Sequence, residues 1–344
     1  MKNLKEIIVD DQTSLYDDIK RQIGERLYSY EFNSNIVFFK YSEPHRYYHT
    51  IEHIYSMLSY NSDKIDDINL FLATVFHDII YDPKRDDNEE RSVEFFKYQY
   101  ELLPLSNHKL SINEDLVCRM IMDTKHHKDT TGYSQPLIDA DLSIFKGSFK
   151  ELLEYEEQIF KEYKFVDWKN YKEKRIKVLT EFDNIINIES RNDNILSLIE
   201  YIENKKPNIG FMAGSFNPFT KGHLNILQKA EKIFDKVIVA YGSNPDKEFS
   251  EKDIPYELHY RQTLIYDGLL TDTLDKLGYE VTVIRGMRNS TDFQYELNQY
   301  RWLQELKKDV KVVSIFCDKE YEHVSSSALR TLIKYDKTSK YIVK

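Results

Sequence analysis

The segment GSFNPFTKGH, residues 214–223, combines residue types that suit phosphate chemistry. Gly214 allows the backbone to turn and to approach a phosphate closely, and Asn217–Pro218 is a typical turn dipeptide. A helix that begins near Thr220 would direct free N–H groups outward, with Thr220 and His223 on one face of its first turn. A hydroxyl and an imidazole directed at one phosphate would stabilise charge that develops in phosphoryl transfer. The segment also fits a plain Gly-Pro loop with a capping threonine and a solvated histidine.

Three further polar segments follow short apolar runs, as GSFNPFTKGH does. GSNPDKEF supplies Lys247, RGMRNSTDFQYE supplies Arg285 and Arg288, and HVSSSALR supplies residues 325–327 and Arg330. If the runs are parallel strands, all four segments lie at the carboxyl edge of one sheet, where ligands bind in such folds. Cations and helix-opening hydroxyls repeated along that edge predict a pocket for a nucleoside triphosphate.

The apolar runs before these segments predict an α/β domain. NIGFMAG, KVIVAYG, VTVIRG and VKVVSIF are short, and helical stretches such as HLNILQKAEKIF lie between them. Strands that alternate with helices indicate a parallel sheet covered on both faces. Residues 1–203 differ, because apolar residues recur three and four apart and strand signals are few. We therefore predict an all-α helical bundle over residues 1–203 and a Rossmann-like parallel α/β domain over residues 204–344.

Histidines are concentrated in the helical region, since seven of the ten lie within the first 127 residues. The first three candidates are spaced by four, so in a helix they project from about one face. A His-Asp pair lies inside the apolar run FLATVFHDIIY, where a buried charge needs a partner. Imidazoles with carboxylates suit a transition metal, which can activate water near neutral pH. The candidates are His45, His49, His53, His77, Asp78, Asp139 and Asp141.

Composition limits the classes of partner. The 344-residue chain has a formal net charge of -10, which argues against broad nucleic-acid binding, because that mode needs clustered Lys and Arg. Small-molecule partners are favoured. Cys118 and Cys317 are too few and too far apart for a disulfide framework or a thiolate metal site, and they fit a reducing cytoplasm. No run of about 18 apolar residues occurs, so we expect no membrane span and a cytoplasmic location.

The C-terminal motifs resemble those of phosphopantetheine adenylyltransferase, within the nucleotidyltransferase superfamily marked by a (T/H)xGH signature and a later serine-rich motif. The likeness covers about residues 208–335 and includes GSFNPFTKGH, NPDK, RGMRNSTDFQYE and VSSSALR in that family's order. It implies in-line attack of an acceptor phosphate on the α-phosphorus of ATP, with Mg²⁺ on the triphosphate and pyrophosphate as the leaving group. The catalytic residues that it implies are Thr220, His223, Lys247 and Arg285. The implied nucleotide- and acceptor-binding residues are Gly214, Ser215, Phe216, Arg288, Glu296, Ser325, Ser326, Ser327 and Arg330.

The acceptor of the adenylyl group is left open by departures from that family. Ser215 and Asn217 stand where the family commonly has Thr and Asp, and Arg330 resembles the ending seen in nicotinamide mononucleotide adenylyltransferases. A pantetheine phosphate is the first expectation, a nicotinamide or nicotinate mononucleotide the second, and a cytidylyltransferase-type reaction the third. Proteins with this domain often assemble into oligomers, so the resemblance also implies a homo-oligomer as an open expectation.

The N-terminal half is similar to the HD superfamily of metal-dependent phosphohydrolases. The likeness lies in YSEPHRYYHTIEHI, FHDIIYDPKRDDNEERS, TKHH and DADLSIF. It implies hydrolysis of a nucleotide or another phosphoester with a divalent transition metal such as Mn, Fe, Ni or Zn. YHTIEH also resembles the YHNxxH of cyclic nucleotide phosphodiesterases, which implies that His49 is the general acid. The implied metal ligands are His53, His77, Asp78 and Asp141.

Other polar residues near this centre have open roles. His45 and Arg46 are candidates for contact with a substrate phosphate. The candidates for further ligands, or for groups that hydrogen-bond to ligands, are His126, His127, Asp82, Glu89 and Glu90. We interpret the chain as a bifunctional enzyme, an ATP-dependent adenylyltransferase fused to a metal-dependent HD phosphohydrolase. The alternative is a nicotinamide or nicotinate mononucleotide adenylyltransferase whose helical domain binds a nucleotide as a sensor, without turnover.

Overall fold

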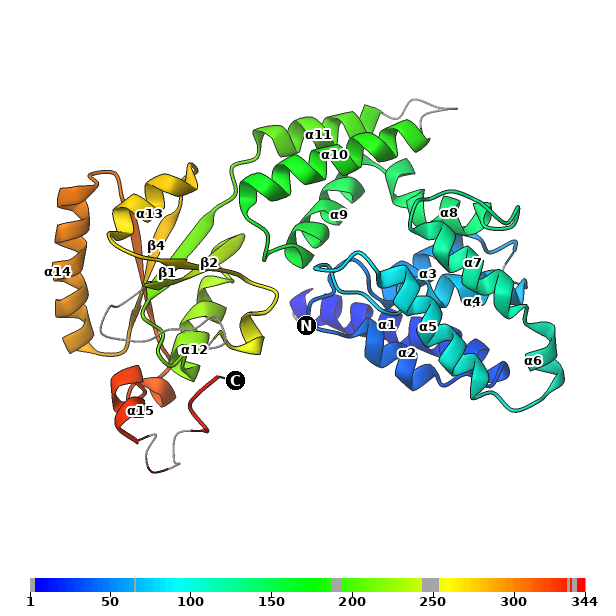
Figure 1. Ribbon diagram of the computed structural model, residues 1–344, viewed down its shortest axis with the longest axis horizontal. Coiled ribbons are helices and arrows are strands. Elements are labelled where there is room, and N and C mark those ends of the chain that lie inside the picture. Colours follow the sequence, from blue (N-terminus) through cyan, green and yellow to red (C-terminus); the bar gives the residue numbers. More distant parts are fainter. Residues whose placement is uncertain are drawn as a thin grey trace. The chain divides into compact units, whose positions relative to one another are not determined.

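The computed structural model describes residues 4–64, 66–186, 193–242, 254–332, 335 and 339–343. Within these ranges the chain is helical up to residue 204, and strands alternate with helices from residue 209 onward (Figure 1). This order confirms the prediction of a helical region followed by a parallel α/β region. The chain divides into two compact units, formed by residues 1–162 with 176–202 and by residues 163–175 with 203–344.

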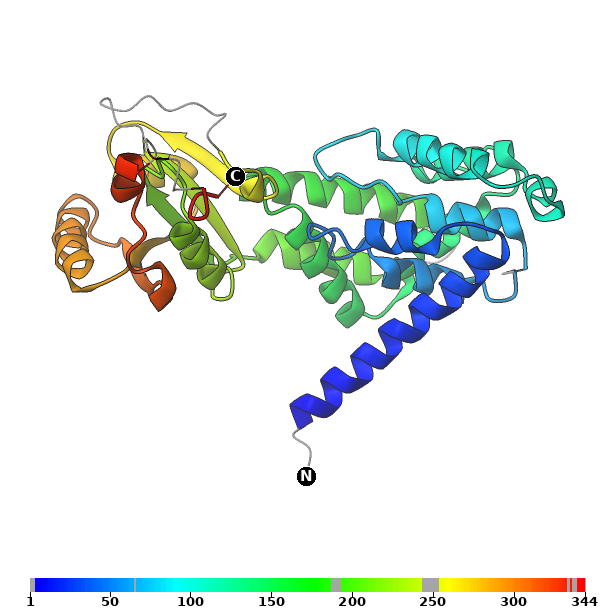
Figure 2. The ribbon, with the colours of Figure 1, turned by 90° about the horizontal axis from the view of Figure 1, so that it is seen from below.

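The first unit is a helical bundle in which α4 (Ile68–Phe76) contacts α3, α5, α7 and α8. Residues 70–76 of α4 are all buried, because INLFLATVF is apolar on almost every side of a helix. Its long first helix, α1, is drawn in blue in Figure 2. The other elements are α1 (Leu4–Ser29), α2 (Ser34–Tyr41), α3 (Ile51–Tyr60), α5 (Asn88–Glu101), α6 (Asn107–Ser111), α7 (Glu114–Thr124), α8 (Gln135–Asp141), the 3-10 helix η1 (Leu142–Lys146), α9 (Phe149–Glu162), α10 (Trp168–Ile186) and α11 (Asp193–Asn204).

The second unit contains, in its described residues, a five-stranded parallel sheet of order β3-β2-β1-β4-β5. The strands are β1 (Ile209–Gly214), β2 (Lys236–Gly242), β3 (Gln262–Tyr266), β4 (Thr282–Met287) and β5 (Lys311–Phe316). The other elements are α12 (Lys221–Ala230), η3 (Tyr256–Leu258), α13 (Leu270–Leu277), α14 (Ser290–Leu306), η4 (Lys319–Tyr321) and α15 (Ser326–Leu332). The strand order reverses between β1 and β4, so loops diverge there and leave a crevice at the carboxyl ends.

The edge strand β3 is not among the four strands that the sequence predicts. Its sequence, QTLIY, begins with two polar residues, and only Gln262 of the strand is buried. By contrast, the central strands β1 and β2 are almost continuously buried and read as apolar runs. β3 lacks this signal because most of its side chains are only partly buried.

Residues 163–175 lie with the second unit, whereas the sequence predicts a single boundary near residue 203. Asp167 accepts a hydrogen bond from the hydroxyl of Tyr279 at 2.5 Å. Lys236, at the start of β2, donates to the carbonyl of Val166 and is 1% exposed. Burial lowers the pKa of Lys236 to about 7, with Asp167 opposing the change. These contacts join positions 70 and 112 residues apart, so local pattern does not reveal them.

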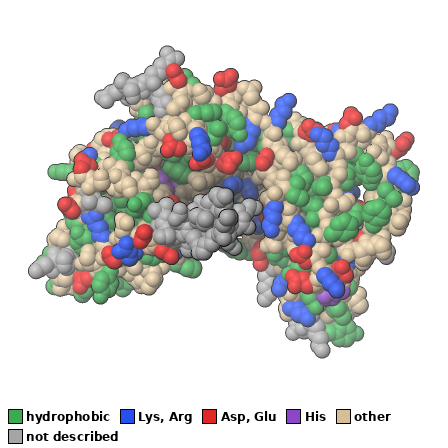
Figure 3. All heavy atoms as spheres, turned by 180° about the vertical axis from the view of Figure 1, so that it is seen from behind, with side chains coloured by type: hydrophobic (Ala, Val, Ile, Leu, Met, Phe, Trp, Pro, Cys, Tyr) green, Lys and Arg blue, Asp and Glu red, His purple; other side chains and the backbone are tan. Residues whose placement is uncertain are grey.

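No helix among the described residues is long and apolar enough to cross a bilayer. On the face drawn in Figure 3, the coloured side chains of Lys and Arg are interspersed with those of Asp and Glu.

Candidate functional site

A cavity of 390 Å³ lies at the carboxyl ends of β1 and β4, where the strand order reverses. Its walls come from the loop after β1, the first turn of α12, the loop after β4 and the start of α15. The structure therefore brings together residues that are up to 118 positions apart in the chain. The sequence-predicted residues that line it are Gly214, Ser215, Phe216, His223, Arg285, Arg288, Glu296, Ser325, Ser326, Ser327 and Arg330. Lys247 lies outside the described residues.

The loop after β1 is shaped by Phe216, which has a left-handed backbone with φ 40°. This conformation is uncommon for a residue with a side chain. The ring folds back beneath the loop and packs on Tyr241 at 5.2 Å and on His223 at 5.0 Å between centroids. A Cβ on Gly214 would lie 2.7 Å from this ring, so only glycine fits at that position.

α12 begins with a reciprocal cap between Thr220 and His223. The Thr220 hydroxyl oxygen accepts from the His223 backbone N–H (3.2 Å), and His223 Nδ1 accepts from the Thr220 N–H (3.1 Å). Because Nδ1 is an acceptor, the imidazole is neutral and carries its proton on Nε2. Burial, together with the charge of Arg288, lowers the pKa of His223 to about 4. His223 thus offers a neutral N–H donor to the cavity.

Thr220 differs from the expectation that its hydroxyl and His223 face one phosphate. The residue is completely buried and is not among those that line the cavity. The first amides of a helix have no intrahelical acceptor, and the Thr220 oxygen satisfies one of them. Thr220 is therefore a capping threonine, as one interpretation of the segment has it. His223 is not the solvated histidine of that interpretation, because its Nδ1 is held in the cap.

Carboxylates hold two of the three arginines that line the cavity. Asp292 forms a bidentate pair with Arg288, at 2.8 Å to Nε and 2.9 Å to Nη2. Glu296 Oε2 lies 3.4 Å from Arg285 Nε. Burial raises the pKa of Glu296, and the charge of Arg285 opposes the change. Asp292 was not predicted from the sequence; it lies in the first turn of α14, and Arg288 precedes that helix by two residues.

The serine-rich segment ties α15 to the loop after β1. The Ser326 hydroxyl donates to the carbonyl of Pro218 at 3.0 Å, and Arg330 donates to the carbonyl of Asn217. Ser325 Oγ accepts from the N–H of Ala328 at 3.1 Å. These bonds fix the two segments against each other, so the walls of the cavity are held before a ligand enters.

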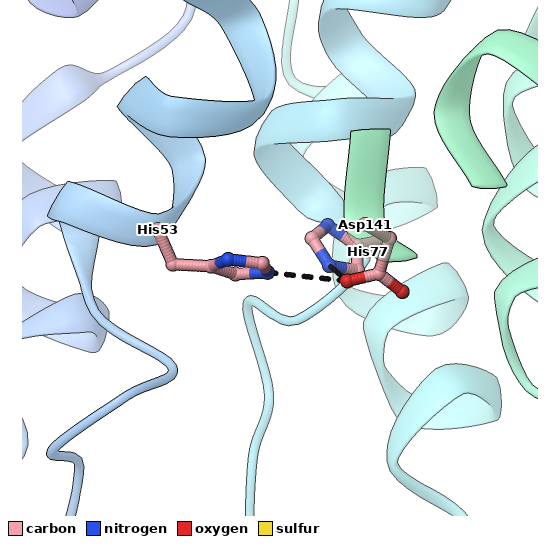
Figure 4. Close-up of side chains that lie close together, drawn as sticks. All are labelled: His53, His77 and Asp141. Carbon is pink, nitrogen blue, oxygen red and sulfur yellow. Dashed lines mark ion pairs between the residues drawn. The ribbon is translucent and has the colours of Figure 1, made fainter. Parts of the chain in front are cut away.

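A second cluster lies in the helical unit and consists of His53, His77 and Asp141 (Figure 4). Asp141 Oδ1 is 3.2 Å from His53 Nε2 and 3.9 Å from His77 Nε2. Both Nε2 atoms are buried and form no hydrogen bond with a described residue. The three residues come from α3, the end of α4 and the end of α8. Two imidazole nitrogens and a carboxylate oxygen within 4.8 Å of one another form the donor set of a divalent transition metal.

Asp78, the fourth predicted ligand, lies beside His77 and outside the three-residue cluster. Its Oδ2 is 3.0 Å from His77 Nε2. Although burial opposes protonation, the charge of Asp78 raises the pKa of His77 to about 9.

Of the neighbouring residues His126 and His127, His127 contacts the cluster. Its Nε2 lies 3.2 Å from Asp141 Oδ2, whereas His126 is exposed. Glu89 and Glu90 both contact Lys125, at 3.8 and 2.5 Å. Asp82 accepts from the N–H of Lys84, and Asp139 accepts from Gln135. These four acidic residues, candidates in the sequence, are engaged away from the three-residue cluster.

His49 is held by Glu162, a residue that sequence reasoning missed. His49 Nδ1 lies 2.7 Å from Glu162 Oε2, and the Tyr81 hydroxyl donates to the same oxygen at 2.7 Å. The other oxygen accepts three backbone N–H groups of residues 47–49. Although burial opposes ionisation, His49 and these donors lower the pKa of Glu162 to about 2 and the carboxylate raises that of His49. A single Glu in the sequence gave no signal of contacts 113 residues away.

His45 and Arg46 are not placed to contact a substrate phosphate. The Arg46 side chain is fully buried and donates to the carbonyl oxygens of His49, Asp78 and Ile79. His45 Nε2 lies 2.8 Å from the carbonyl of Tyr81. The expectation fails because the backbone carbonyls after α4 need donors, and these two side chains supply them.

Comparison with known proteins agrees with the fold and cavity of the second unit. Residues 211–332 match the cytidylyltransferase-like family, so this unit is a nucleotidyltransferase domain. The chain is 35% identical over 138 residues to the phosphopantetheine adenylyltransferase of Mycoplasma capricolum subsp. capricolum, which covers 38% of this chain and 99% of that protein. It is 31% identical over 137 residues to the phosphopantetheine adenylyltransferase of Streptococcus pneumoniae serotype 4, covering 37% and 84%. Through this region the chain belongs to the phosphopantetheine adenylyltransferase family.

A solved structure from Vibrio parahaemolyticus, provisionally described as a nicotinate-nucleotide adenylyltransferase, covers 41% of this chain and 88% of its own. The sequence identity is 16% and the TM-score is 0.28. A likeness at that score carries no argument about the acceptor.

Proposed function

We propose that the second unit transfers the adenylyl group of ATP to the phosphate of a phosphopantetheine-like acceptor and releases pyrophosphate. The observation that supports this most is the neutral donor of His223 in a cavity that three arginines and four serines also line. His223 Nε2–H would donate to an oxygen of the transferred phosphoryl group as negative charge develops. No proton has to leave the imidazole, so His223 acts by charge stabilisation rather than as an acid.

The arginines fit the role of holding phosphates. Arg285 and Arg288 already lie against Glu296 and Asp292, which fixes their planes before ATP binds. Ser325 and Ser327 line the same cavity, and their hydroxyl groups would donate to the triphosphate, whereas the Ser326 hydroxyl already donates to the Pro218 carbonyl. Mg²⁺ would enter on the triphosphate itself, as is usual when a site offers few carboxylates to the metal.

The experiment that tests this proposal is pyrophosphate exchange into ATP with each acceptor. We expect exchange with 4′-phosphopantetheine and little with nicotinamide or nicotinate mononucleotide. If exchange is faster with a mononucleotide than with 4′-phosphopantetheine, the second unit is instead a mononucleotide adenylyltransferase. Arg330 is the residue that favours this second function. Arg330→Ala should then affect the KM of the mononucleotide, whereas Ser215→Thr should improve turnover of phosphopantetheine if that is the acceptor.

We also propose that the first unit is a metal-dependent phosphohydrolase of the HD type. His53, His77 and Asp141 would hold a divalent ion through Nε2, Nε2 and Oδ1, with Asp78 joining them. The ion would supply Lewis-acid chemistry to a phosphoryl group. The two buried imidazole nitrogens without hydrogen-bond partners among the described residues support this assignment most directly.

His49 fits the role of the group that protonates the leaving oxygen. Its Nδ1 is held by Glu162, which leaves Nε2 as the atom that can deliver a proton. Tyr81 stacks on the ring at 4.2 Å and limits its rotation. Glu162 would therefore set both the orientation and the charge of His49.

Metal analysis and hydrolysis assays decide between an enzyme and a binding module. We expect purified protein to hold a transition metal and to cleave nucleotide phosphoesters after loading with Mn²⁺, Ni²⁺ or Fe²⁺. Metal bound without hydrolysis of any nucleotide or phosphoester would instead make the helical domain a nucleotide sensor for its neighbour.

A further inference from the structure

A cavity of 700 Å³ lies in the helical unit, lined by residues of α1, α3, η1 and α9 and of the loop before α3. Of the three-residue metal cluster, only His53 lines it. The cavity belongs to the first unit throughout, so it is separate from the nucleotide cavity of the second unit. Its volume falls within the range of about 300–1,000 Å³ that is usual for small-molecule sites.

His53 presents its second ring nitrogen without a protein acceptor. A histidine that binds a metal through Nε2 carries its proton on Nδ1, and that N–H is normally held by a carbonyl, carboxylate or water. For His77 the acceptor is the carbonyl of Thr74, at 2.9 Å. No described residue hydrogen-bonds to His53 Nδ1, and His53 lines the cavity while only 7% exposed. A ligand in the cavity could therefore accept this hydrogen bond.

Four uncharged polar side chains of the lining likewise form no side-chain hydrogen bond with a described residue. Thr50 is the N-cap of α3, yet its hydroxyl makes no capping bond. Ser56, Ser143 and Gln158 form no hydrogen bond with a described residue and line the same cavity. Hydroxyls and a carboxamide both donate and accept, so they suit a ligand rich in hydroxyl, amide or ring-nitrogen groups.

The charge of the lining disfavours a phosphorylated ligand. It includes Glu52 and Glu151, and neither Lys nor Arg occurs among its described residues. Lys20 lies 4.3 Å from the Tyr16 ring centroid but is not part of the lining. Among the described residues of the lining, a phosphate would meet carboxylates without a compensating cation, which costs binding free energy.

Aromatic rings complete the chemistry of the cavity. Tyr16, Tyr47 and Tyr48 line it, and the Tyr48 ring lies 4.7 Å from that of His53. Burial raises the pKa of Tyr48 well above its usual value, so its phenol stays neutral. Such rings stack on flat heteroaromatic groups.

We propose that this cavity binds an uncharged nucleoside, whose ring lies against the tyrosines and which hydrogen-bonds to His53 Nδ1. The bound nucleoside fixes the orientation of His53, so its binding and metal binding strengthen each other. Only this coupling rests on the metal site proposed above. Nucleoside binding itself can be measured in the metal-free protein.

Calorimetric titration of the full chain with uridine and with guanosine tests the site. Adenosine is avoided, because the second unit is proposed to hold an adenine nucleotide. Ser56→Phe fills the cavity, and Ser59→Phe is the matched control, since Ser59 is exposed on the same helix and does not line the cavity. We expect metal-free wild-type protein and Ser59→Phe to bind one nucleoside alike, and Ser56→Phe to bind it at least about tenfold more weakly.

Tyr47→Ala tests the aromatic wall without touching the core, because Tyr47 is partly exposed, and Tyr133→Ala is its control outside the cavity. We expect weaker nucleoside binding only in Tyr47→Ala. Manganese should raise the affinity for the nucleoside by the same factor by which the nucleoside raises that for manganese. The proposal is overturned if no nucleoside binds at millimolar concentration, if Ser56→Phe and Ser59→Phe bind equally, or if uridine monophosphate binds the metal-free protein more tightly than uridine.

Discussion

His223 has two roles that its two ring nitrogens separate. Nδ1 closes the helix cap with Thr220, and Nε2–H is left for the cavity. His223→Ala should lower adenylyl transfer by roughly 100- to 1,000-fold, because it removes a donor to the transferred phosphoryl group. Pyrophosphate exchange measures the loss, and metal content of the first unit is the control. Retained exchange would remove His223 from the mechanism.

Thr220→Ala separates capping from catalysis. The change should destabilise the second unit by about 1 kcal/mol, because an N-cap oxygen is lost, and should lower adenylyl transfer much less than His223→Ala does. Thermal unfolding and exchange assays measure the two effects. If instead the transfer rate falls as far as in His223→Ala while stability is unchanged, the Thr220 hydroxyl acts on phosphate as the sequence alone suggests.

The lowered pKa of His223 also predicts a pH dependence. The group binds a proton in the unfolded chain below about pH 6.5 but in the folded chain only near its pKa of about 4. Its contribution to stability is therefore complete above pH 6.5 and is lost as the pH falls toward 4, on the order of 3 kcal/mol at most. His223→Asn keeps an acceptor at the cap without titrating. NMR of the His223 ring should show a neutral imidazole at pH 6, and wild type should lose its stability advantage over His223→Asn between pH 6.5 and 4.

Glu162→Gln tests the support of His49 in the first unit. The glutamine keeps a side-chain oxygen that accepts from the backbone N–H groups, but it loses the charge that raises the pKa of His49. Hydrolysis of alkyl phosphoesters should fall about 10- to 100-fold, because their leaving oxygen needs a proton, while p-nitrophenyl esters should be affected much less. The basic limb of the pH–rate profile should also move to lower pH. Equal losses on both esters would reduce Glu162 to a structural role.

At the scale of elements, sequence patterns predicted the fold class of each domain better than the contacts within the site. The central strands are apolar runs because both faces are buried, so a parallel sheet and its carboxyl edge could be predicted, and with them most of the residues that line the cavity. The edge strand β3 could not, because it lacks that run. The role of Glu162 depends on contacts that only the folded chain defines, whereas the Thr220 cap is local and was one of the two interpretations of the segment.

The docking of residues 163–175 on the sheet is an element-scale feature that can be measured. Tyr279→Phe removes the hydroxyl that donates to Asp167, which should cost about 1 kcal/mol. Amides of residues 163–175 should then exchange with deuterium several-fold faster. Tyr256→Phe, at an exposed tyrosine of the same unit, should leave that exchange unchanged. Unaltered exchange in Tyr279→Phe would show that this contact does not hold the segment.

For the whole molecule, the two proposed activities should respond separately to metal. His77→Ala removes one ligand of the cluster, so bound transition metal and phosphoester hydrolysis should both be lost, while adenylyl transfer in the presence of Mg²⁺ should stay within about twofold. Metal analysis and the two assays on one preparation measure this. A parallel loss of adenylyl transfer would contradict the independence of the two sites.

The second unit takes residues 163–175 from a position in the chain ahead of α11, so the two bodies interleave along the polypeptide. A genetic crossover at residue 203 that replaced everything upstream with foreign sequence would leave Lys236 buried with no Val166 carbonyl to receive its N–H. Recombination at that point would therefore destabilise the second unit. Two domains that were each contiguous in sequence would not lose stability in this way. We therefore expect homologous genes to encode the two units together.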